Sequence, residues 1–234
     1  MRFYKFLQTI VLFGGLIGLS GAQASVINFA GINDTGSILY STTQSGANLS
    51  ATVTFTLNAL SANSATFQVN VSNDSFGAGT NQLMAFGIQT VSPTLTGAST
   101  TGSAWNAGIN TTLPTFQTVD LCIWSSNGCS GGAIKNGLAE GASSSFFLTL
   151  TTTGDFLNGI AFTGPYGIKI QNFGNTNNSF EFAGCVVGSP NCGNNPVHPD
   201  SNRVPEPASI ALVALGLLAA SLVGRRRARA LDVC

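Results

Sequence analysis

The feature that most constrains the fold is a two-residue alternation of apolar and polar side chains in the middle of the chain. It is clearest over residues 51–58 (ATVTFTLN) and 65–72 (ATFQVNVS). Successive side chains of a β-strand point to opposite faces, so this period predicts strands with one face in a core and one in water. Shorter segments of similar character lie at 26–30, 83–91, 115–124, 145–152, 167–173 and 179–186.

Turn-forming dipeptides separate these segments, for example Asn127-Gly128, Asn136-Gly137 and Asn158-Gly159. The chain shows no amphipathic helical period between its two ends. Many short strands with frequent Gly and Asn turns predict an all-β domain, an antiparallel β-sandwich or jelly roll, over residues 25–190.

Charge is scarce, and most of the positive charge lies at the two chain ends. Charged residues make up 8% of the sequence, against about 25% in an average globular protein. Between the basic ends, three basic residues (Lys135, Lys169, Arg203) stand against seven acidic ones. Nucleic-acid binding needs clustered Lys and Arg, so this middle region argues against a nucleic-acid partner.

The N-terminus has the three parts of a secretory signal peptide. Arg2 and Lys5 form a positive region, and residues 6–19 form an apolar one. The predicted cleavage site is formed by Ala22, Ala24 and Ser25. We expect signal peptidase to remove residues 1–24, which leaves Ser25 as the first residue of the mature protein.

The C-terminus also has three parts in a fixed order. A short proline motif comes first, an apolar run over 208–224 follows, and an arginine cluster ends it. The motif is Val204, Pro205, Glu206 and Pro207, and the cluster is Arg225, Arg226, Arg227 and Arg229. About 17 apolar residues suffice for one short transmembrane helix. Basic residues stay cytoplasmic, so residues 230–234 would be inside and the β domain outside, held off the membrane by a linker at 191–203.

This arrangement resembles the PEP-CTERM sorting tail of Gram-negative bacteria, a tail that is also labelled the ice-binding protein C-terminal domain. The resemblance covers residues 204–229 of the chain. It implies that an exosortase-type enzyme recognises Pro205-Glu206-Pro207 and processes a membrane-anchored precursor. It also implies a mature form at the cell surface or outside the cell, in bacteria that make exopolysaccharide and biofilm. Residues 231–234 (LDVC) extend past the point at which such tails often stop.

Four cysteines lie in the exported part: Cys122, Cys129, Cys185 and Cys192. An oxidising compartment favours disulfides, and four cysteines allow three pairings. We favour the two local pairs because turn residues separate the members of each. Zinc sites use closer ligand pairs, so we expect no metal. The repeated spacing resembles that of a four-cysteine PEP-CTERM subgroup called cistern.

No residue pattern predicts catalysis or a cofactor. The single histidine, His198, lies in the presumed linker, where it cannot be held beside a nucleophile. A glycoside hydrolase needs two facing carboxylates. The candidates, Asp120, Glu140, Asp155 and Glu181, adjoin turn sequences, where surface acids are common. Asn33-Asp34 and Asn73-Asp74 could offer oxygen ligands to calcium but are more simply turn formers.

Three functions remain open for the exported domain. The first is a structural surface or matrix component associated with exopolysaccharide. The second is a carbohydrate-binding module or adhesin, with Trp105 and Trp124 as stacking faces; burial in the core is at least as common for such rings. The third is ice binding, through two outward threonine rows. These are Thr52, Thr54 and Thr56, and Thr149, Thr151 and Thr153. Threonine favours exposed strand positions in any case.

Overall fold

The described part of the chain is an all-β fold. The computed structural model describes residues 25–175, 177–190 and 192. Its strands are β1 (Val26–Phe29), β2 (Thr35–Gln44), β3 (Ala47–Leu60), β4 (Ser64–Asn73), β5 (Phe76–Gly77), β6 (Gly79–Ser92), β7 (Leu95–Thr101), β8 (Asn106–Leu113), β9 (Gln117–Trp124), β10 (Ser143–Thr152), β11 (Ile160–Phe173) and β12 (Ser179–Val186). Short 3-10 turns occur at η1 (Pro114–Phe116), η2 (Ile134–Asn136) and η3 (Phe156–Asn158). All of the strand pairs are antiparallel, so the predicted fold class is confirmed at this level.

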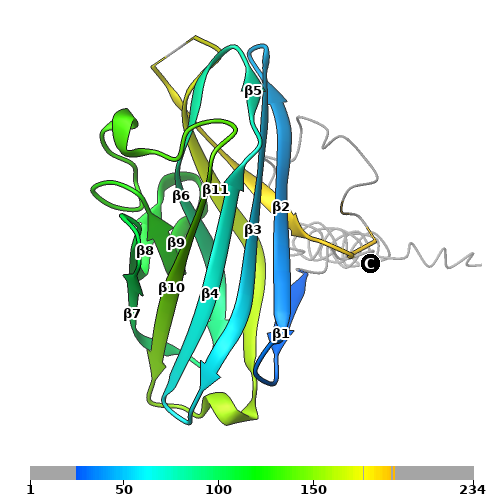
Figure 1. Cartoon of the computed structure of the whole chain (residues 1–234), viewed down its shortest axis with the longest axis vertical. Helices are drawn as coiled ribbons and strands as arrows, with labels where there is room; N and C mark the ends of the chain where they lie inside the picture. The colour runs from blue at the N-terminus through cyan, green and yellow to red at the C-terminus, as the bar shows by residue number, and fades with distance from the viewer. Residues whose placement is uncertain (1–24, 176, 191, 193–234) are drawn as a thin grey trace, which may run out of the picture.

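The strands lie in two layers that face each other (Figure 1). The first sheet has the order β7-β10-β4-β3-β2, with β5 beside β3. The second sheet has the order β11-β6-β9-β8, with β1 beside β11. Strand β12 pairs with β11 along most of its length and with β2 at Cys185 and Val186, so it links the two sheets at one side.

The alternation in β3 and β4 places the two faces as the sequence predicts. Ala51, Val53, Phe55 and Leu57 of β3 are buried, and the intervening polar residues are half-buried or exposed. Between the sheets, aromatic rings pack edge to face: the ring centroids of Phe29 and Phe67 are 4.9 Å apart. Burying such rings is a main source of the stability of a fold this poor in charge.

Strands β2, β7 and β8 lie outside the segments that the sequence predicts. Their sequences (TGSILYSTTQ, LTGASTT and NAGINTTL) are rich in Gly, Ser and Thr and carry a weak apolar period. The predicted strand at 115–124 begins instead at Gln117, because Pro114 starts the 3-10 turn η1. Pairing with β3 for β2, with β10 for β7 and with β9 for β8 orders these three segments despite their weak apolar period.

A smaller apolar cluster lies on the outer side of the second sheet. It contains Ala85, Leu113, Val119, Cys122 and Cys129. The segment between β9 and β10 covers this side of the sheet, because it carries Cys129 and pairs Leu138 with Leu83 of β6. The second sheet is therefore covered on both faces in this region.

No helix among the described residues is long and apolar enough to cross a membrane. The predicted transmembrane segment at 208–224 and the predicted signal peptide at 1–24 lie outside the described residues.

Candidate functional site

Most of the residues predicted for signal cleavage, sorting and membrane orientation fall outside the part of the chain that the structure describes. These are Ala22, Ala24, Val204, Pro205, Glu206, Pro207, Arg225, Arg226, Arg227 and Arg229. His198 of the predicted linker also lies outside the described residues. Ser25, the predicted first mature residue, is described. Its carbonyl accepts hydrogen bonds from the Tyr166 hydroxyl at 2.8 Å and from the Gly164 amide at 3.3 Å. These two hydrogen bonds attach Ser25 to β11.

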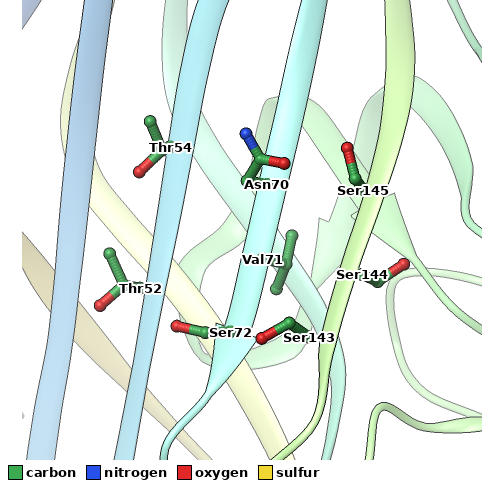
Figure 2. Close-up of a pocket in the computed structure, with 8 residues that line it drawn as sticks. All are labelled: Thr52, Thr54, Asn70, Val71, Ser72, Ser143, Ser144 and Ser145. Carbon is green, nitrogen blue, oxygen red and sulfur yellow. The ribbon is translucent and has the colours of Figure 1, made fainter.

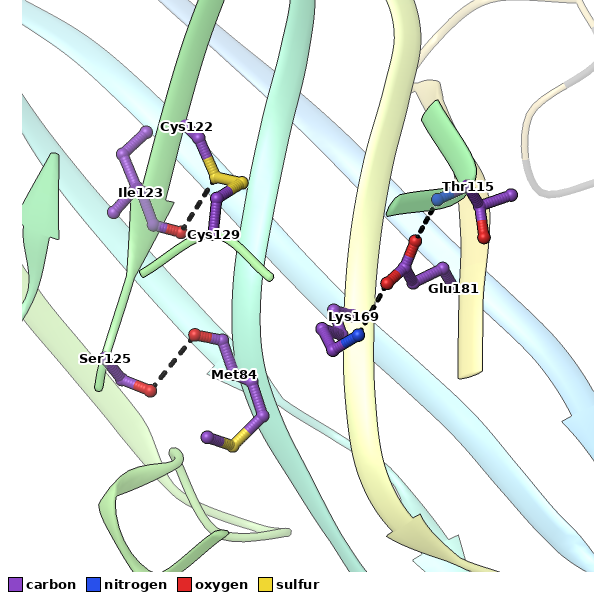
Figure 3. The surroundings of a disulfide bond; sticks show 8 residues. All are labelled: Met84, Thr115, Cys122, Ile123, Ser125, Cys129, Lys169 and Glu181. Atoms are coloured by element: carbon purple, nitrogen blue, oxygen red, sulfur yellow. Dashed lines mark hydrogen bonds and ion pairs between the residues drawn. A yellow bond between two sulfur atoms is a disulfide. The ribbon is translucent and has the colours of Figure 1, made fainter. Parts of the chain in front are cut away.

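The structure contains both local disulfides, Cys122–Cys129 and Cys185–Cys192. The first attaches the covering segment to β9 beneath it, as Figure 3 shows. The second attaches the end of the described chain to β12. The described residues include no group of three His, Cys, Asp or Glu side chains that could hold a metal ion.

The two tryptophans were considered as stacking faces for a carbohydrate, and the structure places them in different surroundings. Trp105 is buried, stacks on Phe146 with ring centroids 5.7 Å apart, and donates its indole N–H to Ser144 Oγ at 3.1 Å. It therefore belongs to the core and offers no face to a ligand. Trp124 is half-buried beside the outer cluster, with its ring close against Gly108 of β8.

Each of the four carboxylates considered for hydrolysis makes a contact within the fold. Asp120 accepts from the Val91 amide at 2.9 Å, and Glu140 accepts from the Asn81 side chain at 2.8 Å. Asp155 caps η3 by accepting from the Leu157 amide. Glu181 was expected at the surface, but it is buried and pairs with Lys169 (Figure 3).

Of the candidate calcium ligands, Asn33 and Asp34 lie in a turn, whereas Asn73 ends β4, is buried and donates its amide to the carbonyls of Asn81 and Leu138. Asp34 accepts hydrogen bonds from the amides of Ala30 and Gly31 at 2.6 and 2.9 Å. These two donors stabilise the carboxylate and hold the pKa of Asp34 below its usual value. Asp74 accepts from Ser72 Oγ at 2.9 Å.

A groove of about 310 Å³ lies on the outer face of the first sheet. Three adjacent strands supply its lining, β3, β4 and β10, as Figure 2 shows. The lining residues are Thr52, Thr54, Asn70, Val71, Ser72, Ser143, Ser144 and Ser145. Apart from Val71, every one of them carries a hydroxyl or an amide, and none is ionisable.

Strand register arranges the groove in two rows across the sheet. The first row is Thr54, Asn70 and Ser145, and the second is Thr52, Ser72 and Ser143. Neighbouring strands lie about 4.8 Å apart, and alternate residues along a strand about 6.8 Å apart. The rows therefore form a small regular lattice of donors and acceptors.

The next row along the sheet carries an aromatic ring. Phe147 of β10 lies opposite Gln68 of β4 and Thr101 of β7. It shares the outer face with Ser145, because the two positions are two residues apart on one strand. Its side chain is 43% exposed, whereas Phe146 beside it is buried. Neither Phe147 nor the groove was predicted from the sequence; the alternation over 145–152 was the available signal.

Both threonine rows considered for ice binding belong to this same sheet. Thr54 and Thr56 form hydrogen bonds with Ser37 and Thr35 of β2 at 2.8 and 3.2 Å. Strand β10 ends at Thr152, so Thr153 lies beyond it and does not extend the second row.

Comparison with known protein families gives a match for one segment of the chain. The family model of the PEP-CTERM protein-sorting motif matches residues 203–227. This motif implies sorting by an exosortase system to the cell surface. No curated protein matches the chain. No solved structure matches it either.

Proposed function

We propose that this chain, whose residues 203–227 carry a PEP-CTERM sorting motif, is a non-enzymatic surface or matrix protein associated with exopolysaccharide. Its precursor is anchored in the membrane by residues 208–224, and exosortase-type processing near Pro205-Glu206-Pro207 delivers the β domain to the surface. The observation that carries the proposal is the sorting motif, because it assigns a destination independently of the fold.

A structural rather than catalytic role accords with how the acidic side chains are used. Asp120 and Asp155 bind backbone amides, and Glu181 is neutralised by Lys169. A hydrolase of the two-carboxylate type needs one carboxyl free to transfer a proton and another free to attack or to activate water. Carboxylates that anchor the backbone serve the fold instead.

The alternative within this proposal is a carbohydrate-binding module or adhesin. The groove on β3, β4 and β10 favours it, because the lining offers hydrogen-bonding groups to solvent without charge. Trp105 no longer supports this alternative, since its ring is enclosed by the core.

The sorting part is tested by replacing Pro205-Glu206-Pro207 with alanines in the full chain, in a host that has the processing enzyme. Proline lacks the amide donor of a continuing helix, so the motif keeps the segment extended for the enzyme. We expect the variant to insert but not to be shortened. Mass spectrometry of the envelope and medium fractions measures the chain length, and protease added to intact cells measures exposure.

A matched control replaces Pro196 and Pro199, which lie upstream of the motif, with alanines. This control should be shortened like the original. Equal shortening of the motif variant would show that the enzyme does not recognise the motif. A β domain protected from protease in intact cells would contradict surface display.

A further inference from the structure

We propose that the groove of β3, β4 and β10, together with Phe147, is a binding site for a neutral polysaccharide. The proposal rests on the proposed function, and it names the chemistry that the displayed domain recognises. From here on, the groove residues and Phe147 are called the glycan site.

Four of the polar side chains of the glycan site are free to bind, whereas Thr54, Ser72 and Ser144 already contact Ser37, Asp74 and Trp105. The side chains of Thr52, Asn70, Ser143 and Ser145 form no hydrogen bond with another described residue. Elsewhere on this face, neighbouring hydroxyls bind each other, as Thr66 binds Thr149 at 3.3 Å. Hydroxyls both donate and accept, and the Asn70 amide does the same through separate atoms. Sugar hydroxyls need this mixture, since each also donates and accepts.

The charge pattern decides between neutral and acidic polysaccharides. No lining residue is ionisable, and Asp74 brings a carboxylate to one end through Ser72. Among the described residues the basic side chains are Lys135 in η2 and the buried Lys169, and neither lines the groove. An acidic polysaccharide would find no cation here and would be repelled by Asp74.

Phe147 supplies the apolar element that a sugar-binding site requires. A pyranose ring has an apolar face of C–H groups that packs on an aromatic ring, while its hydroxyls project sideways toward polar groups. Phe147 lies one row beyond Asn70 and Ser145, so a ring seated on it places its hydroxyls over the groove. The projecting side chain also interrupts the flat threonine array that an ice surface would need.

The test uses the full chain, purified from the envelope in mild detergent, and affinity electrophoresis through gels that contain one polysaccharide each. The neutral probes are dextran, laminarin, mannan and agarose, and the acidic probe is alginate. We expect at least one neutral probe to retard the protein and alginate not to. Phe147→Ala should weaken the apparent Kd at least about tenfold, a loss of about 1.4 kcal/mol.

Three further variants separate binding from folding. Phe147→Tyr keeps the ring and should keep the retardation. Asn70→Ala removes the central amide and should weaken binding. Phe76→Ala removes another exposed phenylalanine, 62% exposed on β5 and not among the lining residues, and should change nothing. Because Phe147 is exposed, Phe147→Ala should leave the Tm nearly unchanged.

Absence of retardation by every neutral probe, stronger retardation by alginate, or equal retardation of Phe147→Ala and the original would overturn the site. Surface exposure is measured separately by the protease assay on cells. If no probe binds but the domain is exposed normally, the glycan site is wrong and the sorting proposal stands. If a probe binds but the domain is not exposed, the sorting proposal is wrong and the glycan site stands.

Discussion

The buried pair of Lys169 and Glu181 gives the sharpest test of how this fold is stabilised. Lys169 on β11 lies opposite Glu181 on β12, and its Nζ is 2.6 Å from Glu181 Oε1. The two side chains are 5% and 4% exposed. Glu181 Oε2 also accepts from the Thr115 amide at 2.6 Å. Gly131 of the covering segment lies against Lys169, because a Cβ placed there would be 3.0 Å from its Cε.

Lys169→Met keeps the length and apolar packing of the side chain but leaves the Glu181 carboxylate buried beside a single neutral donor. Removing one partner of a buried ion pair costs about 3–5 kcal/mol, because the remaining charge has lost its compensation. At about 2–4 °C per kcal/mol for a domain of this size, the Tm should fall by about 6–20 °C. The double variant Lys169→Met/Glu181→Leu removes both charges, so it should recover most or all of the loss.

The assay is equilibrium urea unfolding of the full chain in mild detergent without reductant, followed by tryptophan fluorescence. Lys135→Met is the matched control, because Lys135 is exposed, and it should change the unfolding free energy by less than about 0.5 kcal/mol. The double-mutant cycle isolates the coupling between the two charges. A loss below about 1 kcal/mol for Lys169→Met, or a double variant as unstable as the single one, would refute this reasoning.

Three other predictions concern the mature ends, the cysteines and the tyrosines. N-terminal sequencing of exported protein should begin at Ser25, and an intact Met1 would contradict signal cleavage. Thiol titration under denaturing conditions should find one free thiol in the precursor, from Cys234, and none in the shortened form. Two extra thiols would mean that a disulfide is absent. Each disulfide should contribute about 2 kcal/mol to stability in the chain-entropy model. Burial raises the pKa of Tyr166 to about 12 and raises that of Tyr40 as well. The stability from the neutral Tyr166 phenol is therefore complete below about pH 10 and is lost as the pH rises through about 12. Ultraviolet titration of the mature form should show no phenolate at pH 10, and one tyrosine titrating there would contradict the burial.

The two-faced strands and the local disulfides could be predicted from the sequence because both depend on residues that are close along the chain. Alternation over 51–58 identifies which side of β3 is buried, since the pleat fixes that relation without any partner. Cys122 and Cys129 are close along the chain, with an Asn-Gly turn between them, so closing this pair needs little ordering of the chain. The sorting motif at 203–227 is likewise a contiguous signal.

The same local pattern predicts the wrong burial for residues whose neighbours in the fold come from distant parts of the chain. Trp105 could be read as a free face, yet Phe86 and Phe146, on β6 and β10, enclose it. Glu181 could be read as a surface acid, yet it is buried at a sheet surface where η1 supplies the Thr115 amide and β11 supplies Lys169. Burial of this kind depends on loop positions that no short-range pattern encodes.

The fold class, the inner and outer sides of the clearest strands and the sorting signal could be predicted from the residues alone, because each depends on consecutive positions of the chain. The strand order, the buried ion pair and the groove became apparent once the strands were paired. Strand β10 lies between β4 and β7, and this order places Ser143 and Ser145 beside Asn70 and Ser72. It also leaves Phe147 uncovered on the outer face. The physical reason is that pairing between distant strands is selected by burial of the whole apolar core, so residues that are far apart in sequence become neighbours only when the complete sandwich forms.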